Sequence, residues 1–141
     1  MKVMKQTHNQ GIMFDYPDKT EGKRDRWIHV QQDIKKDVSY LVHKKDWQMV
    51  ITHSPLGEYG HIHHRLTSQI VSIEATNQNL YYFGKYYKKK VPAHLNEITD
   101  KDEKEKRKLT NIYASQKKVM KHLNHMMKYE NWIKAKDWRS L

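Results

Sequence analysis

The sequence predicts an α/β fold, in which helices cover a parallel sheet. Short apolar runs of strand-forming residues alternate with segments whose apolar side chains recur at helical spacing, in the order β, α, β, α, β, α. This order favours a parallel sheet with flanking helices. A histidine-rich motif directly follows the second predicted strand, and ligands of such sheets bind beyond the carboxyl ends of the strands. Because no repeat or linker is evident, residues 1–141 are expected to form a single domain.

The first part of the chain is expected to hold two strands and a helix. Residues 11–16, "GIMFDY", are a short apolar run and are predicted to form a buried strand. Residues 24–44 are predicted to form an amphipathic helix, because their apolar positions recur every three or four residues. These positions are Trp27, Val30, Ile34, Val38 and Leu41. Residues 47–52, "WQMVIT", are predicted to form the second strand.

The alternation continues after the histidine motif. Residues 61–77 suit a helix with Leu66, Ile70 and Ile73 turned inward. Residues 80–87, "LYYFGKYY", suit a third strand because they are rich in aromatic residues.

A long helix is predicted to follow. Thr99 and Asp102 resemble a capping box, from which the helix would run to about residue 129. Its inward stripe is expected to consist of Leu109, Ile112, Tyr113, Gln116, Met120, Leu123 and Met127. The opposite face, "DKDEKEKRK", mixes both signs of charge and is typical of a solvated helical surface. The last residues hold two tryptophans, which are expected to pack back on the domain.

The composition limits the classes of partner and compartment. The formal net charge is +11 at pH 7, and five of the 27 basic residues are arginine. A basic chain attracts anionic partners, but base readout and phosphate forks favour arginine, so nucleic acid is not the expected partner. The lack of cysteine excludes disulfides and thiolate zinc sites. We see no signal peptide and no membrane-spanning run, so a soluble, cytoplasmic protein is expected.

The residues with the clearest chemistry lie in the stretch "ITHSPLGEYGHIHHRL", residues 51–66. His61 and His64 are three residues apart, which places both on one face of the first turn of the predicted helix. His63 is expected to face solvent. His53 would cap the end of the strand or orient a neighbour, and we favour this structural role over a role as a ligand.

Two imidazoles on one helical face can share a site. One can bind a metal ion, because zinc commonly takes imidazole nitrogen and carboxylate oxygen, while the other stabilises an oxyanion or protonates a leaving amine. Gly57 and Gly60 allow a tight turn, from which Tyr59 would reach the same oxyanion. The same spacing also occurs by chance in histidine-rich surface helices that bind no metal. The alternative interpretation is therefore that this stretch is an exposed polar segment without a ligand.

The stretch "VITHSPLGEYGHIHHRL" resembles the third signature of the PIG-L/LmbE-like de-N-acetylases. That signature is a Thr-His-Asx-Pro stretch followed by Gly-Glu-Tyr-Gly-His-x-x-His, and Ser54 takes the Asx place here. "MFDYPD", "LYYFGKYY" and "RKLTNIYASQ" resemble further strands and the late helix of the family, so the resemblance spans most of residues 11–135. It implies a Rossmann-like fold and zinc-dependent hydrolysis of an N-acetyl group, usually on an amino sugar of the N-acetylglucosamine type.

The resemblance also implies roles for individual residues. His64 would be a zinc ligand, and His61 would be the catalytic histidine near the oxyanion and the leaving amine. Tyr59 would polarise the substrate carbonyl, and Asp18 would contact the substrate. Zinc is therefore the expected cofactor, and an N-acetylated amino sugar is the expected substrate.

One part of the family pattern is missing from the sequence. The family opens with a strand followed by His-Pro-Asp-Asp-Glu or a close variant, which provides two zinc ligands and the aspartate general base, and no such motif is present. We therefore expect a truncated, partial LmbE-like domain that needs a homo-oligomer or a partner chain to supply the missing half. The alternatives are a non-catalytic remnant (a pseudoenzyme) that binds a sugar or a partner, and a basic protein that binds nucleic acid or another anionic surface.

Overall fold

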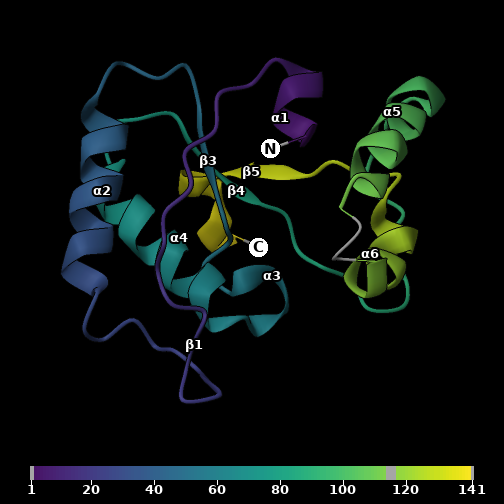
Figure 1. The fold of residues 1–141 in the computed structure, drawn as a ribbon. Helices are drawn as coiled ribbons and strands as arrows, with labels where there is room; N and C mark the ends of the chain where they lie inside the picture. The colour runs from purple at the N-terminus through teal and green to yellow at the C-terminus, as the bar shows by residue number, and fades with distance from the viewer. Residues whose placement is uncertain (1, 114–116, 141) are drawn as a thin grey trace. The chain divides into compact units, whose positions relative to one another are not determined.

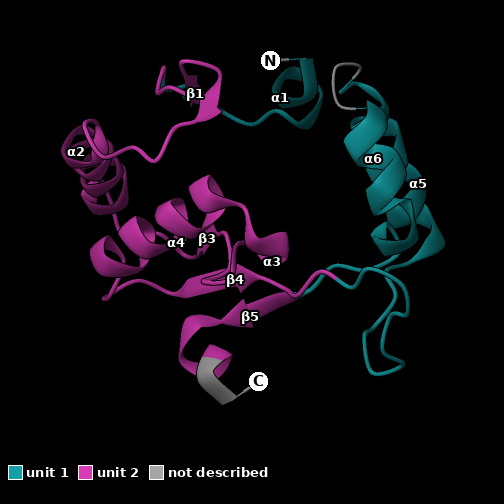
Figure 2. Ribbon diagram, turned by 90° about the horizontal axis from the view of Figure 1, so that it is seen from below, with its two compact units in different colours: residues 1–14, 87–131 teal, residues 15–86, 132–141 magenta. Residues whose placement is uncertain are grey.

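The computed structural model describes residues 2–113 and 117–140, and the chain divides into two compact units. Unit 1 consists of residues 1–14 and 87–131, and unit 2 consists of residues 15–86 and 132–141 (Figure 1; Figure 2). Unit 2 contains the histidine motif and the larger sheet.

Unit 2 is a mixed α/β structure built on a three-stranded sheet. The strands are β3 (Val50–Thr52), β4 (Leu80–Phe83) and β5 (Trp132–Lys134), in the spatial order β3-β4-β5. β3 runs parallel to β4, with Ile51 opposite Tyr81. β5 runs antiparallel to β4, with Tyr82 opposite Ile133. The predicted α/β class with flanking helices is confirmed, but the sheet is mixed because its third strand comes from the C-terminal segment.

Two helices of unit 2 contribute buried apolar side chains to its core. They are α2 (Gln31–His43) and α4 (Ile62–Glu74), which pack against each other, and α4 also contacts β3 (Figure 2). Ile34, Val38 and Val42 lie four residues apart on α2 and therefore share one helical face. The buried cluster consists of Val42, Val71, Ala75, Leu80 and Tyr82. Burial of these side chains is the main force that holds the helices on the sheet.

The remaining elements of unit 2 are short. They are the antiparallel pair β1 (Lys19–Thr20) and β2 (Lys23–Arg24), the single turn α3 (Gly57–Gly60) and the 3₁₀ segment η3 (Ala135–Ser140). Glu21 and Gly22 join β1 to β2 with φ of 52° and 75°. Positive φ at both central residues is the conformation that a two-residue hairpin turn prefers.

Unit 1 is helical and mostly solvated. Its helices are α1 (Lys2–Thr7), α5 (Asp100–Asn111), α6 (Lys117–Leu123) and the 3₁₀ segment η2 (Asn124–Met126). The predicted cap of α5 is confirmed, because Thr99 Oγ1 accepts a hydrogen bond from the Asp102 N–H at 3.2 Å. Met127 is the buried apolar residue of this unit among the residues described, at 7% exposure.

Several predicted elements need correction. Residues 11–16 form no strand, and Met13 is 84% exposed, because no other strand lies beside this segment to pair with it. The helix predicted from residue 24 begins at Gln31 and the strand that begins at Leu80 ends at Phe83. Ile73 is 56% exposed rather than inward, since Val71 fills the core in its place.

The long helix predicted for residues 99–129 is also different. α5 ends at Asn111, and a separate helix begins at Lys117. Tyr113, expected on the inward stripe, is 48% exposed, and Gln116 lies outside the described residues. Over the part of the chain that the structure covers, every helix is too short or too polar to cross a lipid bilayer.

Candidate metal centre

The histidine motif lies where the parallel strands end. β3 ends at the buried Thr52, and His53 follows it directly. The His53 ring meets the ring of Phe83, the last residue of β4, edge to face with centroids 5.6 Å apart. The carboxyl ends of the two strands therefore meet beside His53, which is the edge where α/β proteins bind ligands.

A strained turn carries Glu58 into this region. Gly57 and Gly60 have φ of 65° and 91°, and Glu58 between them has φ of 53° and ψ of −66°. Positive φ is costly for a residue with a side chain, so contacts around Glu58 must hold it there. Two of them pair it with Ser54, whose N–H donates to Glu58 Oε1 at 2.8 Å and whose Oγ accepts from the Glu58 N–H at 3.0 Å.

The other carboxylate oxygen of Glu58 joins two histidines. Oε2 lies 3.1 Å from His53 Nδ1 and 2.6 Å from His64 Nδ1. The two imidazole rings stack, with centroids 3.8 Å apart and planes 13° from parallel. Burial tends to raise the pKa of the Glu58 carboxyl, but hydrogen bonds from His53, the Ser54 backbone and His64 outweigh it and lower that pKa. Glu58 is therefore an anion between two imidazoles.

His61 and His64 lie together, as the three-residue spacing predicts. Their ring centroids are 4.7 Å apart. Burial, followed by the nearby charge of His64 and Arg24, lowers the pKa of His61. Burial also lowers the pKa of His64, against the opposing effect of its hydrogen bond to Glu58. Both imidazoles are thus biased towards the neutral form, which is the form that binds metal ions and accepts protons.

His61 keeps one polar atom unused. Its Nδ1 is buried and has no hydrogen-bond partner among the described residues. A buried nitrogen without a partner is uncommon in folded proteins, and one explanation is a bound group that the structure does not contain.

His53, Glu58 and His64 fit a metal ion. Each offers one ligand atom, and these three atoms all lie within 4.8 Å of one another. Two imidazole nitrogens and one carboxylate oxygen are a donor set that zinc accepts in catalytic sites with an open position. The set differs from the prediction, which named His64 alone and favoured a structural role for His53. Glu58 was missed, although its place between two glycines was a signal for an unusual backbone.

Tyr59 belongs to the same region. Its ring lies 5.4 Å from that of His64 and 6.1 Å from that of His61, and the residue is 53% exposed. The predicted trio of Tyr59, His61 and His64 is thus brought together in space. The phenol is open to solvent, where it can meet a substrate.

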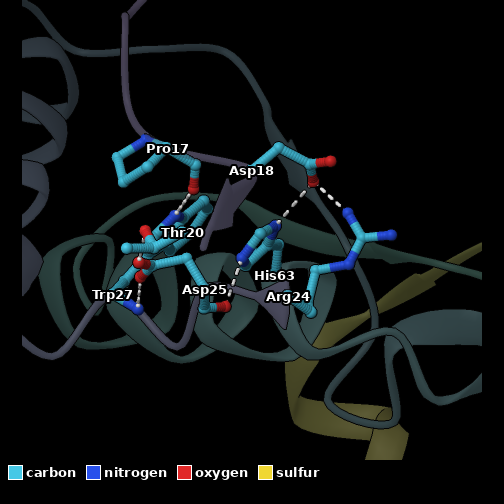
Figure 3. A network of polar contacts seen from close by, with 7 residues as sticks. All are labelled: Pro17, Asp18, Thr20, Arg24, Asp25, Trp27 and His63. Atoms are coloured by element: carbon cyan, nitrogen blue, oxygen red, sulfur yellow. Dashed lines mark hydrogen bonds and ion pairs between the residues drawn. The ribbon is translucent and has the colours of Figure 1, made fainter. Parts of the chain in front are cut away.

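The remaining predicted site residue, Asp18, lies in a neighbouring network. Figure 3 shows its carboxylate between Arg24 and His63, with Oδ1 3.4 Å from His63 Nδ1. Asp18 also acts on His61 electrostatically, in the direction that raises the His61 pKa. Asp18 is therefore next to the histidine cluster, and its role in substrate binding stays a prediction.

The prediction that His63 faces solvent is wrong. His63 is 8% exposed, and its ring stacks on the Trp27 indole with centroids 4.1 Å apart and planes 1° from parallel (Figure 3). Its Nε2 lies 2.8 Å from the Asp25 carbonyl oxygen and donates to it, because a carbonyl only accepts. Residues 17–27 therefore cover His63, whose ring centroid is also 5.4 Å from that of His61, and the spacing of the histidines does not reveal this cover.

No family model matches the chain, and no solved structure matches it. "Uncharacterized protein L374" of Acanthamoeba polyphaga mimivirus is 28% identical over 137 residues, which cover 97% of this chain. The chain spans about half of that viral protein, 55% of its length.

Proposed function

We propose that this chain carries the histidine-rich part of a zinc-dependent de-N-acetylase centre of the PIG-L/LmbE type, which acts on an N-acetylated amino sugar. The single observation that supports this most is the joining of His53 and His64 by Glu58 at the carboxyl end of β3, with His61 and Tyr59 beside them. His53, Glu58 and His64 would hold the zinc ion. Zinc, when bound, supplies Lewis acidity towards the amide carbonyl and lowers the pKa of water.

The side chains around the cluster would divide the chemistry of amide hydrolysis. The Tyr59 hydroxyl would donate a hydrogen bond to the acetyl oxygen as negative charge develops there. His61 would stabilise the developing oxyanion or protonate the leaving amine, while the carboxylate base of the missing loop would take the proton from the attacking water.

We further propose that a second chain completes the centre. The family places a loop with two zinc ligands and a carboxylate base upstream of this motif, and the sequence has no such loop. β3 lies at one edge of the described sheet, and an edge strand offers unpaired backbone groups to another strand. A homo-oligomer or a partner chain that pairs with β3 would bring added ligands towards His53.

Zinc binding tests the metal part of this proposal. We expect the purified chain to bind about one zinc ion per active centre, measured by mass spectrometry of the metal and by calorimetry. His64→Ala should lose this binding, because it removes one of the three ligands. His43→Ala is the matched control, since His43 is an exposed histidine of α2, and it should bind zinc like the unchanged chain. Equal zinc binding by all three proteins, or none by any of them, contradicts the proposal.

Activity tests the assignment of His61. Release of acetate from N-acetylglucosamine derivatives should fall by about 10²–10⁴-fold in His61→Gln, the range for loss of a general acid–base group. Zinc content should stay unchanged in this variant, which separates proton transfer from metal binding. Acetate release at the unchanged rate in His61→Gln contradicts the role of His61.

A further inference from the structure

Unit 2 contains a cavity that the histidine cluster does not use. Its volume is about 770 Å³, and it lies between residues of α4, β4 and η3. Small-molecule sites in proteins have volumes of about 300–1,000 Å³. None of the lining residues is a histidine, so this cavity and the candidate metal centre are built from different side chains.

Two arginines give the cavity a positive charge. Arg26 and Arg65 both belong to its lining, which includes no aspartate or glutamate. Neither guanidinium has an ion pair or a hydrogen bond within the described part of the chain. Arg65 is also positioned by the backbone, because a Cβ added at Gly57 would come within 2.8 Å of Arg65 Cγ. Guanidinium groups recognise the paired oxygens of phosphates and carboxylates.

A buried hydroxyl in the lining lacks a partner. Ser68 is 1% exposed, and its Oγ has no hydrogen-bond partner among the described residues. Its neighbour Ser72 is fully engaged, because Ser72 Oγ donates to the Ser68 carbonyl at 2.6 Å and lies 2.7 Å from the Tyr82 hydroxyl. A buried polar atom without a partner costs about 1–3 kcal/mol. Because less than 1 Å² of this oxygen is accessible, it is closed off from the open cavity and marks an imperfectly satisfied wall rather than a contact for a ligand.

Apart from Gln69, the rest of the lining is apolar or aromatic. Tyr82 and Trp138 meet edge to face with ring centroids 5.6 Å apart. Leu66 and Ile73 extend this apolar wall along α4, which gives a role to the exposed Ile73 side chain. Such a wall favours the flat face of a ring.

We infer that this cavity binds a small ligand in which a ring carries an anionic group, with the ring against Tyr82 and Trp138 and the anion towards Arg26 and Arg65. The anionic group can be a phosphate or a carboxylate, because the guanidinium fork accepts both. This inference does not depend on the proposed deacetylase function.

Calorimetric titrations of the full chain, kept free of metal by a chelator, test the inference. Two matched pairs of probes distinguish the anion: adenosine monophosphate against adenosine, and 2-naphthoate against 2-naphthylmethanol. We expect at least one anionic probe to bind at least about tenfold more tightly than its neutral partner, a factor that corresponds to about 1.4 kcal/mol. Preference within the first pair identifies phosphate, and preference within the second identifies carboxylate. Absence of binding by both anions, or equal binding of the anionic and neutral members of both pairs, overturns the inference.

Variants place the binding in this cavity. Arg65→Gln should weaken binding of the anion by at least about tenfold, since it removes a charged hydrogen-bonding group. Arg107→Gln, which changes an arginine of unit 1, should leave it unchanged. Ser68→Ala should leave both binding and the midpoint of urea unfolding unchanged, because the hydroxyl is closed off from the cavity and has no partner to lose in the free protein. Binding that Arg65→Gln and Arg107→Gln affect equally overturns the assignment to this cavity.

Discussion

Unit 1 and unit 2 differ in the way their helices are stabilised. The helices of unit 2 pack on each other and on strands, and their apolar side chains form a buried cluster. The helices of unit 1 depend more on polar contacts, such as the Thr99 cap of α5, the ion pair between Arg107 and Glu103 and the hydrogen bond from Arg107 to Asn124. Exposed ion pairs stabilise a helix by only a few tenths of a kcal/mol, about 0.3–0.5. Side chains that must keep fixed distances to one another need a packed hydrophobic core to hold their backbone in place. The histidine cluster accordingly lies in unit 2, which contains the buried cluster.

A change in the core of unit 2 should have the largest effect. Leu80→Ala removes a side chain that is 9% exposed and lies within the buried cluster, so we expect it to lower the free energy of unfolding by about 3 kcal/mol. Met127→Ala in unit 1 is the comparison, and a smaller loss of about 2 kcal/mol is expected, because Met127 is buried but lies outside the buried cluster of unit 2. Urea unfolding followed by circular dichroism measures both. Equal losses would show that unit 1 has a core comparable to that of unit 2.

A change in a helix cap should have a smaller and local effect. Thr99→Ala removes the hydroxyl that accepts from the Asp102 N–H, which costs about 1 kcal/mol in helix stability. We expect faster hydrogen exchange of α5 amides and no change for the amides of β4. Thr110→Ala is the matched control, because Thr110 lies near the end of the same helix and bonds only to the Arg107 carbonyl. Faster hydrogen exchange of the β4 amides in the Thr99→Ala variant would contradict the prediction, because it would show that the loss of a cap in unit 1 also destabilises unit 2.

A fall in pH from 7.5 to 5.5 should lower the free energy of unfolding by the smallest amount of these changes, and the loss should arise in unit 2. The folded state holds the pKa of His61 and His64 below the ordinary value of 6.5. The unfolded chain therefore binds more protons, and stability falls as the pH drops below 6.5 through the folded pKa values. Glu58 continues this trend, because its lowered pKa makes the fold lose stability as the pH falls from 4.5 through the folded pKa of Glu58.

Unfolding midpoints between pH 7.5 and 5.5 check the histidine part of this prediction. We expect His61→Gln to reduce the loss of stability over this range. His122→Gln, a change at an exposed position of α6, should give the same pH dependence as the unchanged chain. A His61→Gln profile that matches the His122→Gln profile contradicts the prediction.

The local elements that the sequence predicted well are those whose pattern decides their structure. The periodic apolar residues of α2 and α4 and the apolar run before His53 led to helices and a strand in approximately the right places. The strand predicted for residues 11–16 does not form, because a strand also needs a second strand to pair with. The composition of a segment does not say whether such a partner strand exists. The antiparallel β5 was missed for the same reason, since its pairing with β4 joins residues far apart in the chain.

The site was predictable in part. The spacing of His61 and His64 correctly placed them together, because neighbours on one helical turn follow from sequence alone. The link from Glu58 to His53 and His64 was not predictable, since it depends on a positive φ that two flanking glycines permit but do not require. The burial of His63 depends on Trp27, which lies outside α2 with a φ of 58° and not on the helical face predicted for it.

The pairing of β4 with β5 has a topological consequence. Phe83 lies opposite Trp132, so the two ends of the segment 84–131 are held side by side by a single strand pair. Adjacent antiparallel strands are usually joined by a hairpin loop of about 2–5 residues. The segment 84–131 takes the place of such a loop, and lengthening a loop costs only about 0.6 kcal/mol for each doubling. The stability of the sheet should therefore depend only weakly on the length of the segment between β4 and β5. If a short turn replaced the helical segment, these two strands should still pair.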